Sequence, residues 1–256
     1  TAIAPIRSAR TYSVDWASGF NYPMYIHVGG ANTPGPANAL GQIEDYGWAL
    51  QNDVNLGFTF GLPYYYKNSN RLDREVATEH QGETTTELLW KLAKEKRNWT
   101  NIAPVRTIGR KSVGGDDWNE TYKGWSFQEE APTPGSVTKI SHSFWDNGGD
   151  LYAVGWEYLP QTNTYKRNLA GEPHIDLNND KQIEAANVIV LLTAEKGPID
   201  ELKHILYTTT GTGNALIFMN GEAVKATWSK PTRESELTFA DRKGEEILFA
   251  RGLTWI

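Results

Sequence analysis

The stretch Ala215-Leu-Ile-Phe-Met-Asn-Gly-Glu-Ala-Val-Lys-Ala-Thr-Trp228 decides the fold of the second half of the chain. It contains two runs typical of strands, Ala215–Met219 and Glu222–Trp228, separated by Asn220 and Gly221. Both of these residues tolerate the positive φ angles of a tight hairpin turn. The stretch therefore predicts two antiparallel strands joined by a two-residue turn.

Further strands are expected on both sides of this hairpin. Ala186–Leu192 is a nearly continuous apolar run, which is typical of a strand buried on both faces. Arg242-Lys-Gly244 indicates another hairpin that leads into Glu246–Ala250. The remaining strands are expected at Val137–Trp145, Tyr152–Tyr158, Thr164–Arg167 and His204–Thr209. The second half is therefore predicted to be mainly an antiparallel β-sheet.

Helical and strand signals alternate in the first half of the chain. Helices are expected at Thr11–Phe20, with Ser13 as the N-cap, and at Ala37–Tyr46, with a strand at Met24–Val28 between them. This alternation favours a mixed α/β arrangement.

A third helix is predicted after Thr84, because Glu87 follows three residues later and the pair resembles a capping box. Its apolar residues share one helical face: Leu88, Leu89, Leu92 and Ala93. A Pro/Gly linker at Ala131–Gly135 separates the two halves. The predicted fold class is α+β, with a mixed α/β domain at residues 1–130 and an antiparallel β-rich domain at 136–256.

Composition excludes several classes of function. The 256-residue chain has a net charge of −6, which argues against a nucleic-acid binder, because such proteins need a basic face. It has no cysteine, so disulfides, thiolate metal sites and cysteine nucleophiles are excluded. No apolar run is long enough to span a bilayer, so membrane attachment is expected only through an anchor upstream of Thr1. No cofactor is expected.

Arg7 and Arg10 are the first candidate ligand-binding residues. Guanidinium groups are planar forks that suit phosphate or carboxylate, and at a spacing of three they share a face if the segment is helical. The beginning of the helix at Thr11 would add a favourable dipole for an anion. The alternative is a structural ion pair with Asp15 or with a carboxylate elsewhere in the chain.

His27, Glu79 and His80 are the second set of candidates, and Arg74 lies near them in sequence. A histidine at the end of a strand and a Glu-His pair on a later loop could form an acid–base or metal site if they converge. A histidine on a strand is also common as a hydrogen-bonded core residue, so both interpretations stay open.

Two patterns in the second half also have structural and functional interpretations. Asp176–Asp180 has the first ligand positions of a calcium loop, but a polar turn between two strands fits better, because Lys181 follows where glycine is needed. His174 could pair with Asp176. Four tryptophans could form a stacking platform for a sugar, line a peptide groove, or belong to the core, and we favour the core: Trp145, Trp156, Trp228 and Trp255.

A series of short motifs runs in order along nearly the whole chain: Pro5-Ile-Arg-Ser-Ala-Arg10, Tyr25-Ile-His-Val-Gly-Gly30, Thr78-Glu-His80, Thr84–Thr86, Trp156-x-Tyr158, Tyr165-x-Arg167, Pro173-His174-x-Asp176, Ala186–Val188, Gly213–Gly221, Trp228 and Gly252-x-x-Trp255. Through these motifs the chain resembles the family of YerB-like putative lipoproteins. The resemblance implies an exported, usually lipid-anchored bacterial protein with two domains of unknown function.

Two departures from this family pattern stand out. The segment that family members normally carry upstream of the arginine motif is not in this sequence, so the first domain is expected to lack N-terminal strands. We expect an upstream fragment or a neighbouring subunit as a partner that completes it. Gln81-Gly-Glu83 replaces the usual aromatic stretch after Glu79 and His80.

The function expected from these features is that of an extracytoplasmic cell-envelope protein that binds without catalysis. Its ligand would be an anionic glycan, a lipid-linked phosphate or a partner protein. One alternative is a cell-wall phosphotransferase or hydrolase that uses Arg7 and Arg10 to stabilise charge. Another is a structural surface component assembled by strand addition.

Overall fold

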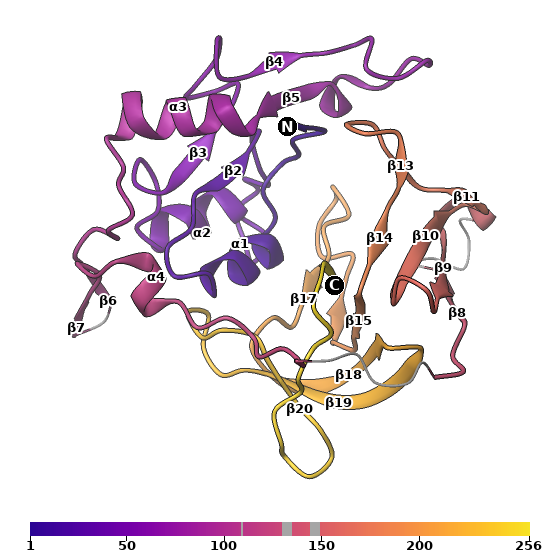
Figure 1. Ribbon diagram of the computed structural model, residues 1–256. Helices are drawn as coiled ribbons and strands as arrows, with labels where there is room; N and C mark the ends of the chain where they lie inside the picture. The colour runs from indigo at the N-terminus through magenta and orange to yellow at the C-terminus, as the bar shows by residue number, and fades with distance from the viewer. Residues whose placement is uncertain (109, 130–134, 144–148) are drawn as a thin grey trace. The chain divides into compact units, whose positions relative to one another are not determined.

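The computed structural model describes residues 1–256 except residues 109, 130–134 and 144–148 (Figure 1). The chain divides into two compact units that interleave along the sequence. Unit 1 comprises Thr1–Lys123, Ala194–Thr210 and Pro231–Glu236, and unit 2 comprises Gly124–Thr193, Gly211–Lys230 and Leu237–Ile256. The linear division expected at the Pro/Gly linker stays a prediction, because residues 131–134 lie outside the described residues.

Unit 1 contains the α-helices that the structure describes and several short strands. Its helical segments are α1 (Thr11–Ser18), α2 (Ala39–Asp45), the 3₁₀ turn η1 (Thr78–His80), α3 (Thr86–Arg97) and α4 (Trp118–Thr121). Its strands are β1 (Ala2–Ile3), β2 (Tyr25–His27), β3 (Asp53–Asn55), β4 (Tyr66–Lys67), β5 (Gly82–Thr85), β6 (Arg106–Ile108), β7 (Lys111–Val113), β16 (Glu195–Lys196) and β17 (Leu206–Tyr207). None of the described helices is long and apolar enough to cross a membrane.

Helix α1 begins one position after Arg10, which is its N-cap in extended conformation. The expected cap, Ser13, was wrong: it lies in the first turn, where its Oγ accepts a hydrogen bond from the Arg10 N–H at 3.2 Å. The helix also ends at Ser18, before the expected Phe20, because the backbone of Gly19 closes the last turn onto Trp16 and Ala17.

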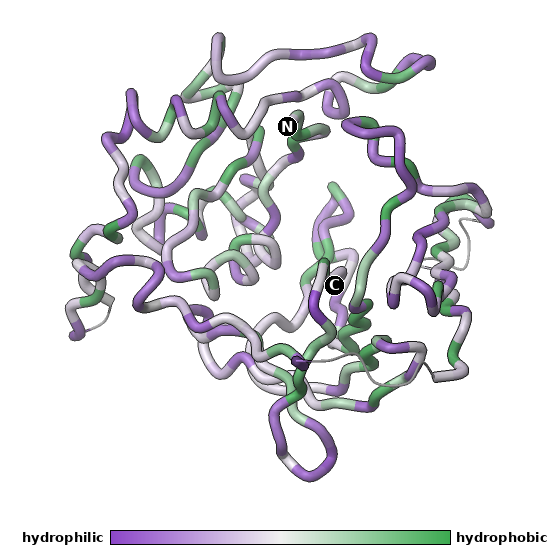
Figure 2. Tube along the Cα trace, in the orientation of Figure 1, coloured by the Kyte–Doolittle hydropathy of each residue, from purple (hydrophilic) through white to green (hydrophobic). Residues whose placement is uncertain are grey.

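Helix α3 has the expected amphipathic pattern, and Figure 2 shows polar and apolar residues alternating along it. The expected cap at Thr84 was wrong by one residue. Thr85 is the N-cap and accepts a hydrogen bond from the Leu88 N–H at 3.2 Å, whereas Thr84 is buried in β5 and donates to the carbonyl of Tyr64. The helix buries Leu89, Leu92 and Ala93.

The core of unit 1 is built around the parallel pair β2 and β3, in which Tyr25 lies opposite Asp53. One apolar cluster includes Val54 and Leu56, both fully buried, together with the inner face of α3. A second cluster joins α1 and α2 through Val14 and its neighbours. A separate small sheet has the order β1-β5-β4.

Two later segments of the chain return to unit 1 and pack on its first helices. β17 contacts α1, and just beyond it the Oγ1 of Thr209 donates a hydrogen bond to Asp15 Oδ2 at 2.7 Å. In the second segment, the guanidinium of Arg233 lies 3.5 Å from the ring centroid of Tyr46. Unit 1 is therefore completed by residues far away in sequence.

Unit 2 contains a five-stranded sheet in the order β20-β19-β18-β15-β21 (Figure 1). The hairpin expected from the sequence is confirmed, with φ angles of 54° at Asn220 and 70° at Gly221. β15 lies inside the sheet, antiparallel to β18 and parallel to β21. The strands are β15 (Asn187–Leu191), β18 (Gly211–Met219), β19 (Glu222–Lys230), β20 (Thr238–Ala240) and β21 (Thr254–Trp255).

A second sheet of unit 2 has the order β11-β10-β9-β8, and β14 also pairs with β10. The segment around Asp176–Asp180 is a turn between β12 and β13, as expected. The elements are β8 (Lys139–Ser143), the 3₁₀ turn η2 (Gly149–Tyr152), β9 (Ala153–Leu159), β10 (Thr164–Leu169), β11 (Glu172–Pro173), β12 (Ile175–Asp176), β13 (Lys181–Gln182) and β14 (Glu184–Ala185).

The tryptophans of unit 2 belong mostly to its core. Trp156 and Trp228 are buried, and Trp255 packs edge-to-face on Trp156 at 5.5 Å between ring centroids. Trp145 lies outside the described residues. The strand expected at Glu246–Ala250 was wrong, because this segment makes only isolated bridges to neighbouring segments. The predicted α+β fold class is confirmed, with a mixed α/β unit 1 and a β-rich unit 2.

Candidate ligand-binding site

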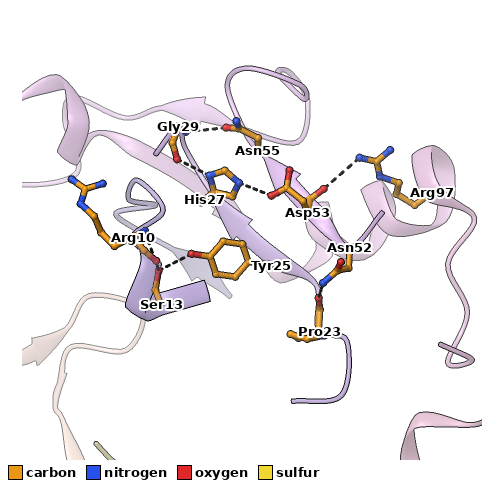
Figure 3. Close-up of polar contacts among 10 residues, drawn as sticks. All are labelled: Arg10, Ser13, Pro23, Tyr25, His27, Gly29, Asn52, Asp53, Asn55 and Arg97. Carbon is orange, nitrogen blue, oxygen red and sulfur yellow. Dashed lines mark hydrogen bonds and ion pairs between the residues drawn. The ribbon is translucent and has the colours of Figure 1, made fainter. Parts of the chain in front are cut away.

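His27 lies at the carboxyl end of β2 and is buried between its two hydrogen-bond partners (Figure 3). Its Nε2 lies 2.6 Å from Asp53 Oδ1, and its Nδ1 lies 2.6 Å from the carbonyl oxygen of Gly29. A carbonyl oxygen can only accept, so Nδ1 carries a proton, and Nε2 shares one with the Asp53 carboxyl group. Both ring nitrogens are therefore occupied by protein groups.

The same contacts order the loops that follow β2 and β3. The backbone N–H of Gly29 donates to Asn55 Oδ1 at 2.9 Å, and Gly29 adopts a positive φ of 61°. The buried pair of His27 and Asp53 thus joins the last residue of β2 to the first residue of β3. This geometry gives His27 a structural role in the core of unit 1.

Arg7 contacts His80, as the sequence hypothesis of a shared site requires of these two residues. Arg7 Nη1 lies 2.5 Å from His80 Nδ1 and 3.0 Å from Nε2, at an exposed position. A guanidinium cannot accept a hydrogen bond, so the imidazole nitrogen accepts. Arg7 lies next to the end of β2, because its carbonyl accepts from the Val28 N–H at 3.0 Å.

Arg10 does not share a helical face with Arg7. Both arginines precede α1, and Arg10 is extended, with φ of −131° and ψ of 150°. Its Nη1 donates to the carbonyl of Ala9 at 2.9 Å. The ion pair of these arginines with Asp15 was also wrong: the Asp15 carboxylate accepts from Gln42, Tyr46 and Thr209.

Glu79 and Arg74 are exposed, and Glu79 adjoins His80 in η1. The structure thus brings Arg7 and His80 together and leaves His27 buried with Asp53. Within the described residues, no group of three or more histidine, aspartate or glutamate side chains is arranged to hold a metal ion.

Unit 1 contains a cavity of about 970 Å³. It is formed by the loop before β2, the residue before β3, the outer face and end of α3, and the beginning of α4. Its lining residues are mostly aromatic rings, side-chain amides and small apolar groups, and they are Phe20, Asn21, Tyr22, Pro23, Met24, Asn52, Trp90, Ala93, Lys94, Asn98, Trp99, Thr100, Asn101, Ile102, Ala103, Pro104, Trp118 and Asn119.

Aromatic rings are prominent among the residues that line this cavity. Trp118 stacks on Tyr122 with ring centroids 4.5 Å apart and an angle of 10° between planes, and Tyr122 in turn stacks on Phe20 at 6.2 Å. Trp118 is held in place because its Nε1 donates to the carbonyl of Phe20 at 3.0 Å. Trp90 projects from α3 with 71% of its surface exposed. Flat apolar faces are therefore available to a ligand.

The loop before β2 has an unusual backbone conformation. Asn21 and Tyr22 have φ angles of 51° and 65°, and Asn98 at the end of α3 has 50°. Left-handed backbone is uncommon for a bulky side chain such as tyrosine, and strain of this kind clusters at ligand sites. Burial raises the pKa of Tyr22, an effect opposed by the Arg106 guanidinium 4.1 Å from its ring centroid.

The polar groups of the cavity are neutral except one. Asn52 is buried, donates through Nδ2 to the carbonyl of Pro23 at 2.8 Å, and leaves its buried Oδ1 without a donor within the described residues. Lys94 is the one charged residue among those that line the cavity. The lining can therefore stack on a ligand, hydrogen-bond to it through amides, and contact one negative group.

Comparisons with known proteins match part of the chain to a family without a described function. Residues 143–256 match the family model described as "Protein of unknown function (DUF3048) C-terminal domain". The chain also matches the crystal structure of YerB protein from Bacillus subtilis, with a TM-score of 0.70 and 19% identity over 100% of this chain and 73% of that one. The resemblance to the YerB-like family is confirmed. No curated protein matches the chain.

None of the six candidate residues predicted from the sequence lines this cavity. A signal was nevertheless present in the sequence. An aromatic residue adjoins an asparagine in Asn21-Tyr22, Asn98-Trp99 and Trp118-Asn119, and all three pairs line the cavity. Such pairs supply a stacking face and a hydrogen-bonding amide at one point of the chain.

Proposed function

We propose that this protein is an extracytoplasmic cell-envelope protein that binds a glycan in the aromatic cavity of unit 1 without catalysing a reaction. The observation that carries the proposal is the cavity lining, in which aromatic faces alternate with side-chain amides. The volume of about 970 Å³ falls at the upper end of small-ligand sites and suits a short oligosaccharide.

The chemistry of the lining matches the chemistry of a sugar ring. A pyranose has an apolar face of C–H groups, which packs on flat rings such as Trp90 and Trp118. Its hydroxyl groups both donate and accept hydrogen bonds, and an asparagine amide offers both functions in one side chain. Asn21, Asn52 and Asn101 provide such amides around the cavity.

Lys94 supports a glycan that carries a negative group. Lysine is a compact charge on a flexible stem, so it can reach a carboxylate or phosphate without a fixed geometry. In this proposal Lys94 takes the role that the sequence analysis gave to Arg7 and Arg10, because neither arginine lines the cavity. An acidic envelope glycan is therefore the ligand class that the lining supports best.

The lining supports binding better than catalysis. General acid–base chemistry needs a titratable pair within hydrogen-bond reach of the substrate. Lys94 is the one charged group on the cavity, and the His27–Asp53 pair is buried with both imidazole nitrogens engaged. These observations favour the binding hypothesis over the phosphotransferase or hydrolase alternative.

The proposal is tested by calorimetric titration with two defined probes: oligomers of N-acetylglucosamine and oligomers that alternate this sugar with N-acetylmuramic acid, which bears a carboxylate. We expect saturable binding, tighter for the acidic probe. Trp90→Ala should weaken binding of both probes about tenfold, and Lys94→Ala should remove the preference for the acidic one.

Phe58→Ala is the matched control, because Phe58 is also an exposed aromatic of unit 1 and does not line the cavity. It should bind both probes like the unmodified protein. The proposal fails if neither probe gives a saturable signal, or if Trp90→Ala binds as tightly as Phe58→Ala.

A further inference from the structure

Arg167 of unit 2 is a buried arginine in an apolar environment. It lies on β10 opposite Trp156 of β9 and has 7% of its surface exposed. Its guanidinium carbon is 4.8 Å from the ring centroid of Trp255 and 5.8 Å from that of Trp156. The side chain therefore lies against two indole rings, and its strand β10 pairs with β9 along its length.

The protein supplies this guanidinium with one neutral acceptor. Arg167 Nη1 donates to His174 Nδ1, so this nitrogen carries a lone pair and the ring is uncharged. Burial and the Arg167 charge lower the pKa of His174, and the same two causes lower that of His142 on β8. No carboxylate within the described residues lies at ion-pair distance from Arg167. The pair suggested for His174 and Asp176 is not formed in the described part of the chain, because Asp176 accepts from the amides of Asn178 and Asn179.

The rest of the fork is unused. Arg167 Nε is buried without an acceptor. Nη2 also has no partner in the described part of the chain. Unlike Nε, it is not a buried atom without a hydrogen bond, so the Nη2 end of the guanidinium is in contact with solvent. The N–H groups of Nε and Nη2 point in one direction, which is the edge that pairs with the two oxygens of a carboxylate.

We propose that the Nε–Nη2 edge of Arg167, between Trp156 and Trp255, binds the carboxylate of a small organic acid. A buried positive charge is costly unless it is paired, and the contacts with indole faces offset only part of this cost. A carboxylate carries one negative charge, which balances the one positive charge of Arg167. The apolar remainder of the organic acid would pack on the indole rings of Trp156 and Trp255. This site lies within unit 2 and is independent of the cavity in unit 1.

The experiment that tests this site follows the Arg167 Nε–H resonance by NMR while sodium acetate is added to the full chain at constant ionic strength. We expect a saturable shift of this resonance. Sodium chloride and inorganic phosphate at the same ionic strength should not produce it. The absence of a saturable shift with acetate, or an equal saturable shift with phosphate, overturns the assignment.

Thermal unfolding gives a second measurement. Acetate should raise the melting temperature of the unmodified protein and of the matched control Arg251→Met, an exposed arginine of unit 2. It should not raise that of Arg167→Met. An equal increase in both variants contradicts the proposal, and if Arg167→Met does not fold, the NMR titration of the unmodified protein decides.

Discussion

Replacing Asp15 by alanine should loosen the attachment of Thr209 to the first helices. The Asp15 Oδ1 atom accepts from Gln42 Nε2 at 2.8 Å and from Tyr46 Oη at 2.7 Å, and Oδ2 accepts from Thr209 Oγ1 at 2.7 Å. One half-buried carboxylate thus joins α1, α2 and a segment that is 194 residues away in sequence.

The magnitude follows from the number of bonds lost. A hydrogen bond to a charged group contributes about 1.5–3 kcal/mol when buried, and partial exposure of Asp15 reduces this to about 1 kcal/mol each. Three bonds give about 3 kcal/mol, and the better helix propensity of alanine returns about 0.5 kcal/mol. Asp15→Ala should therefore lower the free energy of unfolding of unit 1 by about 2.5 kcal/mol.

The assay is a double-mutant cycle with Thr209→Val, which keeps the shape of the threonine and removes its donor. Hydrogen exchange of the α1 and α2 amides reports on unit 1 separately, which matters because a chain with two units need not unfold in one step. We expect Thr209→Val to cost about 1 kcal/mol and to cost almost nothing when Asp15 is already alanine. If the two effects add within about 0.5 kcal/mol, the carboxylate does not hold this segment.

Two further predictions concern Gly213 and Tyr25. A Cβ atom at Gly213 would lie 2.5 Å from Nε1 of the buried Trp228, so Gly213→Ala should cost about 1–3 kcal/mol in urea unfolding, whereas Gly61→Ala, with no atom within 4 Å, should cost little. Burial raises the pKa of Tyr25 to about 12 from 10.0, so its neutral form contributes stability that is present below pH 10.0 and lost as the pH rises towards 12. Tyr25→Phe should lose less stability than the unmodified protein over this interval, and an equal loss in both would contradict the shift.

Residues that are adjacent in sequence were enough to predict turns and the approximate starts of helices, because the geometry of these features depends on neighbouring residues. The Asn220-Gly221 turn and its two strands follow from residues that are adjacent in sequence, and the register of the hairpin confirms them. The start of α3 was missed by one position because Thr84, Thr85 and Thr86 can all act as caps, and only the tertiary burial of Thr84 distinguishes them.

Features that depend on distant segments were not predictable in this way. The cavity is assembled from residues near 20, 52, 90–104 and 119, and no periodicity links them. His27 was recognised as a candidate, but its partner Asp53 lies on another strand and only the parallel register brings them together. The expected strand at Glu246–Ala250 failed because a strand needs a neighbour along its whole length, and this segment has only single bridges.

The interleaved order of the two units has a consequence for biosynthesis. A ribosome makes the chain from its N-terminus, so α1 and α2 emerge long before Thr209 and Arg233, which pack on them. Until residue 236 has been made, unit 1 lacks these contacts, so α1 and α2 remain without the later segments that pack on them. Most of unit 2 is synthesised during that interval. A folding factor that protects nascent chains would therefore act longer on α1 and α2 than on the later segments that pack on them.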